Sequence, residues 1–229
     1  MKIITFIFAR GGSKGIKNKN IRLLNGKPLL YYSIDIAKKF CTKQNIFVST
    51  DNNKISSIAK RYGVQVIKRP KLLSKDKSSE ILAWKHAINY LHKKNIFFDI
   101  FLTLPTTSPL RKKKDIQKCL DMFNDRCDVV ITGTKSKRNP WYNVLKVKNK
   151  TNYASLLINS SKKFLNRQST PKTFDMTTVA YVANPNYILK TKNLFNGKVR
   201  VCEIPQERAI DIDDYYDLKM ARLLIKKKK

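Results

Sequence analysis

The chain is poor in glycine, proline and cysteine. It has 229 residues, of which 7 are glycine and 8 proline, while hydrophobic residues make up 42%. That balance argues against disorder and suits one globular domain over 1–229. The four cysteines (Cys41, Cys119, Cys127 and Cys202) form no C-x-x-C pair, which excludes the usual zinc and dithiol motifs. We expect them to be free, buried and reduced.

Long hydrophobic runs are also lacking. No stretch approaches the roughly 20 apolar residues that a membrane-spanning helix needs. The apolar run within the opening MKIITFIFARGG is short, ends in arginine and paired glycines, and is followed by no small-residue cleavage pattern. These absences predict a soluble protein without a membrane partner, located in the cytoplasm.

Acidic residues are scarce, with 16 Asp and Glu against 48 Lys and Arg, a net charge of +32. Such a charge is typical of proteins whose partners carry phosphates, including nucleic acids. The lysines are spread along the whole chain, however, which indicates a compositional bias. A nucleic-acid-binding protein would interleave aromatic residues with a basic face or carry a recognition helix, and we find neither. That class remains the rival from outside enzymology.

Short apolar runs alternate with helical patterns along the chain. The runs that predict strands buried on both faces are 2–9, 45–50, 64–68, 97–104 and 128–134, with further strands at 177–183 and 199–205. Helices are predicted over 28–40, 51–63, 78–94, 115–123, 186–195 and 214–229. This alternation indicates an α/β fold, a mostly parallel sheet flanked by helices.

The alternation stops between residues 136 and 176. Residues 143–157 read as a hairpin with its turn at 149–152, and a polar, proline-containing stretch follows. We interpret 136–176 as an arm inserted into the core sheet.

The first strand is followed by a basic glycine loop, ARGGSKGIKNKN, residues 9–20. Ligands bind at the carboxyl ends of strands in open α/β sheets, and this loop lies there. The backbone of Gly11, Gly12 and Ser13 can approach an anion closely, and Arg10, Lys14 and Lys19 can add charged hydrogen bonds. The loop therefore suggests a phosphate site, with a solvated glycine turn as the alternative.

Both standard phosphate fingerprints are missing. The G-x-G-x-x-G pattern fails because Ser13 stands where its second glycine is needed. The G-x-x-x-x-G-K-[ST] pattern fails because Ile16 and Lys17 occupy the positions of its second glycine. These absences exclude a Rossmann dinucleotide loop and a Walker loop.

Carboxylates gather near the end of the chain, in AIDIDDYYDLK, residues 209–219. In an extended segment, Asp211 and Asp213 project on the same side. Two such carboxylates can share Mg²⁺ (or Mn²⁺), which also binds phosphate oxygens. The alternative is that Asp213 or Asp214 caps the helix that follows.

A third polar segment, LPTTSPLRK at 104–112, directly follows a predicted central strand. Thr107 and Ser108 supply hydroxyls there, and Arg111 supplies a guanidinium. The segment is either a ligand-contacting loop or an ordinary strand-to-helix connection.

The order of these segments, with RQSTPKTFDMTTVAYV (167–182) between the second and the last, resembles the acylneuraminate cytidylyltransferase family. Its members are the CMP-sialic acid synthetases and their relatives for legionaminic, pseudaminic and Kdo-type acids. The resemblance runs nearly end to end. It implies a Rossmann-like, glycosyltransferase-A-like fold with an arm that builds a homodimer. It also implies transfer of CMP from CTP to a 2-keto-3-deoxy sugar acid, with release of pyrophosphate.

The resemblance also implies roles for single residues. Arg10, Lys19 and Asn20 match positions that hold the triphosphate and cytidine, and Arg69 and Ser79 fall where cytosine is read. Asp211 and Asp213 match the metal pair, so that Arg10, Lys19 and Asp211 become the expected catalytic residues. On the acceptor side the matching residues are Thr107, Ser108, Arg111, Arg167, Gln168 and Tyr181.

One departure concerns the acceptor. Sialic acid enzymes carry a glutamine that contacts the sugar where this chain has Pro105. Losing an amide in the acceptor pocket implies a different pattern of acyl groups, because an unpaired polar group on a bound sugar is costly. The acceptor is therefore expected to be N-acetylneuraminic or legionaminic acid, with pseudaminic acid or Kdo as alternatives. A sugar-1-phosphate nucleotidylyltransferase is a second rival, but its usual Gly-Thr-Arg step is missing.

Overall fold

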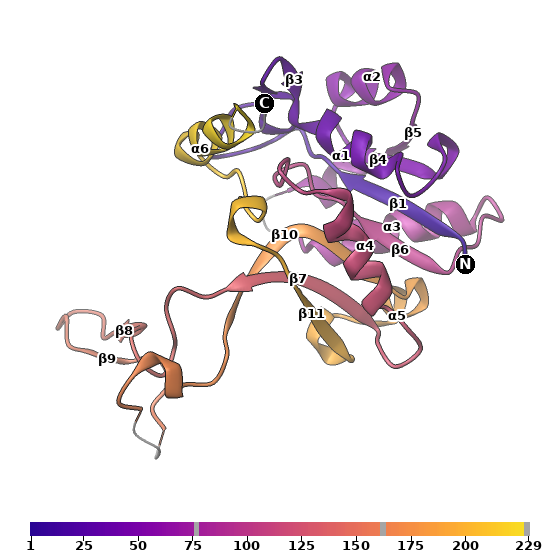
Figure 1. Cartoon of the computed structure of the whole chain (residues 1–229). Coiled ribbons are helices and arrows are strands. Elements are labelled where there is room, and N and C mark those ends of the chain that lie inside the picture. Colours follow the sequence, from indigo (N-terminus) through magenta and orange to yellow (C-terminus); the bar gives the residue numbers. More distant parts are fainter. Residues whose placement is uncertain (76–77, 161–163, 227–229) are drawn as a thin grey trace.

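The computed structural model of the protein describes residues 1–75, 78–160 and 164–226. Its centre is a seven-stranded sheet in the order β11-β7-β10-β6-β1-β4-β5 (Figure 1). The strands are β1 (Ile3–Phe8), β4 (Ile46–Thr50), β5 (Gln65–Lys68), β6 (Ile100–Thr103), β7 (Val129–Lys135), β10 (Phe174–Ala183) and β11 (Val199–Glu203). Two short strands, β2 (Leu23–Leu24) and β3 (Lys27–Pro28), form a separate hairpin.

Most neighbouring strands run parallel. β1 pairs in parallel with β4 and β6, β4 with β5, and β7 with β11, whereas β10 is antiparallel to both β6 and β7. The predicted α/β fold with a mostly parallel sheet is confirmed. Because β1 and β6 are parallel neighbours, the loops that follow them leave the sheet at the same edge, which brings residues 10–20 beside residues 104–112.

Helices cover both faces of the sheet. They are α1 (Leu29–Ala37), α2 (Asn53–Arg61), α3 (Glu80–His92), α4 (Lys113–Met122), α5 (Pro185–Lys190) and α6 (Tyr215–Lys226). Alternation along β1 decides which face each residue serves: Ile4 and Phe6 pack toward α3 and α5, while Ile7 packs toward α1, α2 and α4. A third cluster joins α6 to Ile16 and Leu110, so that the last helix fastens both cleft-forming loops.

The structure corrects the predictions for β5 and for the burial of the cysteines, and it describes only part of the predicted C-terminal helix. β5 is an edge strand whose Gln65 and Lys68 are exposed, so it is not buried on both faces as predicted. All four cysteines are free, but Cys41 is only half-buried, and burial raises the pKa of its thiol. The C-terminal helix is described to residue 226, and the last three lysines of the prediction lie outside the described residues. None of the described helices is long and apolar enough to cross a membrane.

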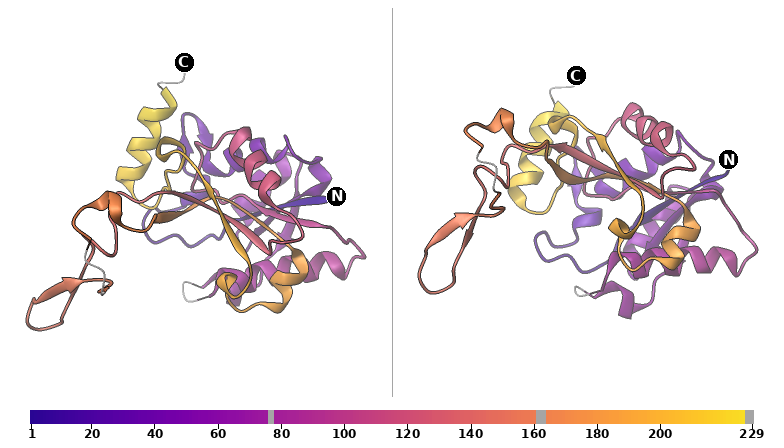
Figure 2. Two further views of the ribbon diagram at one scale, coloured as in Figure 1. Left: turned by 60° about the horizontal axis from the view of Figure 1, so that its bottom comes forward. Right: turned by 90° about the horizontal axis from the view of Figure 1, so that it is seen from below.

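The arm leaves the sheet between β7 and β10 and projects from the body of the protein (Figure 2). It carries the hairpin of β8 (Leu145–Val147) and β9 (Ala154–Leu156). The turn between these strands lies where the sequence predicts it and includes Lys150 and Asn152, whose φ angles are positive. The core strand β10 already begins at Phe174, where it pairs with Lys135, so the last three residues of the predicted insertion belong to the sheet.

Candidate active site

A cleft of about 570 Å³ lies beyond the carboxyl ends of β1 and β6. Helix α3, the segment before α6 and strand β10 border it. The sequence-predicted site residues that line it are Arg10, Ser13, Lys14, Lys19, Asn20, Arg69, Ser79, Thr107, Tyr181, Asp211 and Asp213. Residues from five separate chain segments therefore meet in one cavity that carries both cationic and anionic groups.

Asn20 joins the two loops that follow β1 and β6. Its side-chain amide donates to the backbone oxygen of Arg10 at 2.8 Å, and its carbonyl oxygen accepts a hydrogen bond from the Thr106 hydroxyl. Asn20 is buried, so both interactions are sheltered from water. The residue lines the cleft, and its side chain is already committed to holding the loops together.

The glycines of the first loop serve different purposes. The Gly11 N–H donates to Asp51 at 2.9 Å, and a Cβ at position 11 would lie 2.8 Å from the Asn52 side chain. A Cβ on Gly15 would lie 2.1 Å from the backbone oxygen of Asp213, which only glycine permits. At Gly12 no described atom stands within 4 Å of a Cβ position. Gly11 and Gly15 thus fix the loop against its neighbours, and phosphate binding by Gly11 and Gly12 stays a prediction.

Arg69 is buried at the wall of the cleft. It donates to the Ser49 backbone oxygen at 2.7 Å and to the Ser49 hydroxyl at 3.1 Å, and its guanidinium lies 5.4 Å from the centroid of the Phe8 ring. Burial lowers the pKa of Arg69 to about 10; the charges of Asp51 and Glu80 oppose this shift and that of Arg10 adds to it. Arg69 therefore stays cationic near neutral pH in a fixed orientation.

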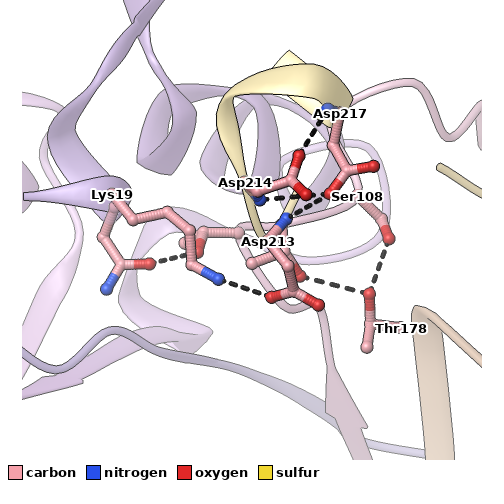
Figure 3. A network of polar contacts seen from close by, with 9 residues as sticks. Lys19, Ser108, Thr178, Asp213, Asp214 and Asp217 are labelled. Carbon is pink, nitrogen blue, oxygen red and sulfur yellow. Dashed lines mark hydrogen bonds and ion pairs between the residues drawn. The ribbon is translucent and has the colours of Figure 1, made fainter. Parts of the chain in front are cut away.

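The structure separates the neighbouring aspartates near the end of the chain. Asp213 accepts a hydrogen bond from the Lys19 ammonium at 2.8 Å and faces the cleft (Figure 3). Asp214 instead accepts from the N–H of Asp217 at 2.9 Å, as a helix-capping residue does. Of the two alternatives for this cluster, capping falls to Asp214, and Asp211 and Asp213 line the cleft together.

Ser108 and Arg111 lie beside the cleft and do not line it. The Ser108 hydroxyl bonds that of Thr178 at 2.8 Å, and Thr178 also bonds Thr107 at 3.1 Å (Figure 3). Arg111 is buried and donates to the backbone oxygens of Ser108, at 2.7 Å, and Pro105. Burial lowers the pKa of Arg111, and the charges of Asp211 and Asp115 oppose that shift. In this arrangement both residues brace the loop, and their sugar contacts stay predictions.

Tyr181 forms part of the cleft on the β10 side. Its ring packs edge-on to Trp84 with centroids 5.3 Å apart, and burial raises the pKa of its hydroxyl, with the charges of Glu80 and Asp211 adding to the effect. The hydroxyl therefore stays protonated and can donate to a ligand. The pairing of β10 with β7 shifts register between Thr177 and Tyr181. The Thr132 hydroxyl lies at this shift, where it donates toward the backbone oxygens of Thr177 and Ala180 and accepts from the Thr177 hydroxyl.

Arg167 and Gln168 lie on the arm, away from this cleft. They line a separate hollow of about 210 Å³ at the base of the arm, together with Asn139 and Phe174. The Arg167 guanidinium donates to the Ser136 backbone oxygen at 2.6 Å. Within one chain the structure does not bring them to the other predicted site residues, and their contact with a sugar stays a prediction.

The donor set of the cleft fits a divalent cation that shares its ligands with a nucleotide. Asp211 Oδ1 is buried and has no hydrogen-bond partner among the described residues. Within residues 1–75, 78–160 and 164–226 there is no group of three or more His, Cys, Asp or Glu that could hold a metal. Mg²⁺ commonly uses one or two carboxylates and takes its other ligands from phosphates and water. The pair Asp211 and Asp213 meets that requirement.

Sequence reasoning missed several residues that organise the cleft. Asp51 and Gly15 fix the first loop, Thr178 joins the second loop to β10, and Asp217 bonds the backbone before α6. Only Asp217 had a local signal, since Asp214 and Asp217 are spaced like a capping box. The other three act through contacts between distant parts of the chain.

Comparison with known proteins places the chain in a family. A family model described as cytidylyltransferase matches residues 4–229. The post-translational flagellin modification protein B of Campylobacter coli is 34% identical over 232 residues, covering 99% of this chain and 96% of that protein. The CMP-N,N'-diacetyllegionaminic acid synthase of Campylobacter jejuni is 33% identical over 229 residues, covering 98% and 95%.

A solved structure supports the same fold. The CMP:2-keto-3-deoxy-manno-octonic acid synthetase complexed with CTP aligns over the whole of both chains with a TM-score of 0.72, at 15% identity. At that identity the likeness concerns the fold alone. The family model and the two relatives cover nearly every residue described above, from the glycine loop to α6. The chain belongs to the cytidylyltransferase family.

Proposed function

We propose that this cytidylyltransferase activates a nonulosonic acid with CTP and releases pyrophosphate. The observation that carries the proposal is the meeting of Arg10, Lys19 and Arg69 with the carboxylates of Asp211 and Asp213 in one cleft. Cations suit a triphosphate, and a carboxylate pair suits the metal that accompanies it. Phosphoryl-type transfer depends mainly on such positioning and charge neutralisation.

The proposed reaction is a displacement at the α-phosphorus. The anomeric hydroxyl oxygen forms a bond to that phosphorus, and the bond to the oxygen bridging the β-phosphate breaks, so that pyrophosphate leaves with the electron pair. The hydroxyl proton passes to a carboxylate oxygen, for which we propose Asp211, since it lines the cleft and has two oxygens, one to bind the metal and one to accept the proton. Arg10 and Lys19 hold the triphosphate in line for the attack.

Mg²⁺ or Mn²⁺ would be held by Asp211 and Asp213 and would neutralise phosphate charge when bound. The remaining nucleotide contacts proposed from the sequence are Ser13, Lys14, Arg69 and Ser79, all of which line the cleft. Arg69 suits recognition of the base because its guanidinium is fixed by two hydrogen bonds to Ser49.

The acceptor is proposed to be N-acetylneuraminic or legionaminic acid. Pro105 lines the cleft, and its backbone oxygen already accepts from the Ser33 hydroxyl at 3.0 Å and from Arg111. A proline side chain has no hydrogen-bond donor, so this position offers none to a sugar amide. The absence of that donor favours the legionaminic type, and the similarity to the Campylobacter jejuni synthase supports the same choice.

We also propose that two copies of the chain assemble through the arm, and that the enzyme works in the cytoplasm. The arm exposes large apolar side chains, with Leu145 59%, Val147 57%, Tyr153 75% and Leu165 87% accessible. A second copy is the simplest partner for such a surface. Light scattering should give twice the chain mass for the natural protein and a lower mass for Tyr153→Glu.

The test of the reaction uses purified full-length protein with CTP, Mg²⁺ and one acceptor at a time. The acceptors are N-acetylneuraminate, diacetyllegionaminate, pseudaminate and Kdo, and pyrophosphate release is measured. We expect release with the diacetyllegionaminate or N-acetylneuraminate, its loss in Asp211→Asn, and its retention in Asp121→Ala, which alters an exposed carboxylate on α4. No release with any acceptor would overturn the proposal.

A further inference from the structure

We propose that Asp217 is a positioning residue for the metal-binding carboxylates. This inference rests on the proposed function, because it explains how Asp213 is oriented toward the cation that the function requires. Asp217 lies in the first turn of α6 and is not among the residues that line the cleft. It acts through the backbone of its neighbours.

The contacts of Asp217 reach beyond the helix it belongs to. Its Oδ2 accepts from the N–H of Asp214 at 3.1 Å, and the Asp217 N–H donates to the Asp214 carboxylate at 2.9 Å (Figure 3). These two bonds form an ordinary capping box. The same Oδ2 also accepts from the N–H of Asp213 at 3.0 Å. That third bond lies outside the capping box, so capping alone does not account for it.

The third bond completes a three-sided restraint on the carboxylate segment. The Ile212 N–H donates to the Thr107 backbone oxygen at 2.9 Å, which ties the segment to the loop after β6. The Asp213 backbone oxygen lies so close to Gly15 that a Cβ there would stand 2.1 Å away, so the segment packs directly against the loop after β1. Asp217 holds the Asp213 N–H from the remaining side. Together they fix the plane of the peptide groups on both sides of Asp213.

The restraint matters because the Asp213 side chain has little packing of its own. It is 73% exposed and pairs with the Lys19 ammonium at 2.8 Å, an interaction that a bound cation must replace. Its direction is therefore set by the backbone that carries it. Asp211 differs in that its Oδ1 is buried. Loosening Asp213 would leave the cation with one well-placed carboxylate, and outer partners of this kind typically change metal affinity 10- to 100-fold.

The experiment measures Mn²⁺ binding to the full chain in the presence of CTP and without acceptor, by the decrease of the free Mn²⁺ resonance signal. Asp217→Ala removes the acceptor, whereas Asp217→Asn keeps an oxygen that can accept from both N–H groups. The matched control is Asn184→Ala, because Asn184 caps α5 by accepting from two backbone N–H groups away from the cleft. Thermal unfolding of each variant is followed in parallel.

We expect Asp217→Ala to weaken Mn²⁺ binding roughly tenfold, and Asp217→Asn to stay within about twofold of the natural protein. Asn184→Ala should lower the unfolding temperature without changing Mn²⁺ binding. Unchanged binding in Asp217→Ala would overturn the inference and leave the proposed function standing. Equal loss in Asp217→Asn and Asp217→Ala would also overturn it, because the charge of Asp217 would then matter rather than its backbone bonds. Absence of Mn²⁺ binding by the natural protein would remove the metal site and this inference together.

Discussion

Replacing Lys19 by methionine should strengthen metal binding by the nucleotide-free protein while it destroys activity. The Lys19 ammonium lies 2.8 Å from Asp213 Oδ1, with the lysine side chain 16% exposed. Without a nucleotide, this ammonium takes the place of a cation on one of the two carboxylates. In the proposed site a divalent ion would have to displace it, and the freed lysine would then become available for the triphosphate. Lys19→Met removes the competitor and keeps a side chain of similar length.

The size of the effect follows from the ion pair. Exposed pairs contribute 0.2 to 1 kcal/mol, and the 73% exposure of the aspartate side chain limits this pair to about 1 kcal/mol. Since 1.4 kcal/mol is a factor of ten, releasing the pair raises Mn²⁺ affinity about fivefold. Removing one positive charge roughly 5 Å from the doubly charged ion adds about 1.7 kcal/mol at the dielectric constant of water. The two effects together, about 2.7 kcal/mol, give about an eightyfold gain as an upper value.

The assay is a Mn²⁺ titration at low ionic strength without CTP, comparing the natural protein, Lys19→Met and Lys17→Met. Lys17 is an exposed lysine of the same loop that does not line the cleft, so its loss controls for net charge. Turnover of Lys19→Met should fall by about 10²-fold or more, as for other lost transition-state donors. Equal or weaker Mn²⁺ binding in Lys19→Met than in Lys17→Met would refute the reasoning.

Three further outcomes test the fold around the cleft. Gly15→Ala should lower the free energy of unfolding by about 1–3 kcal/mol through overpacking, while Gly12→Ala, which faces open space, should leave it nearly unchanged in denaturant titrations. Arg208→Ala should lower the free energy of unfolding by about 3–5 kcal/mol, because the buried Asp115 would lose an ion-pair partner that it contacts at 2.9 Å. Adding Asp115→Ala in a double-mutant cycle should restore part of that loss. The raised pKa of the Tyr181 hydroxyl means that folding favours its protonated form. Its contribution to the free energy of unfolding is therefore complete below pH 10 and declines as the pH rises toward the pKa of the folded state. Tyr181→Phe should make the free energy of unfolding depend less on pH in that alkaline range.

The sequence carried enough information for the sheet and for the place of the cleft. Apolar runs with helical stretches between them predict parallel strands, and parallel strands place the ends of β1 and β6 side by side. The position of β5 at the edge was missed, although Gln65 and Lys68 make the run 64–68 less apolar than the central strands β1 and β6. Edge position depends on what the rest of the chain leaves unpaired.

At the cleft, too, the residues placed by a local sequence pattern were predictable, and those placed by long-range contacts were not. The period of an extended segment places Asp211 and Asp213 on one side, and this arrangement needs no long-range information. The contact of Gly15 with the Asp213 carbonyl joins residues almost 200 positions apart, and a lone glycine gives no sign of it. Arg167 was assigned by resemblance alone, and the fold of one chain leaves it on the arm.

The way the arm leaves the sheet has a consequence for how such enzymes diversify. β7 and β10 are antiparallel neighbours, and the pair Lys135 and Phe174 closes the arm at its base. Lengthening a loop whose ends are already held together costs little, since doubling its length adds only about 0.6 kcal/mol. The nucleotide-handling half of the molecule is thereby insulated from change in the arm. We therefore expect that arms of different length and sequence can be exchanged at these two residues, which makes Lys135 and Phe174 suitable junctions for chimeric enzymes.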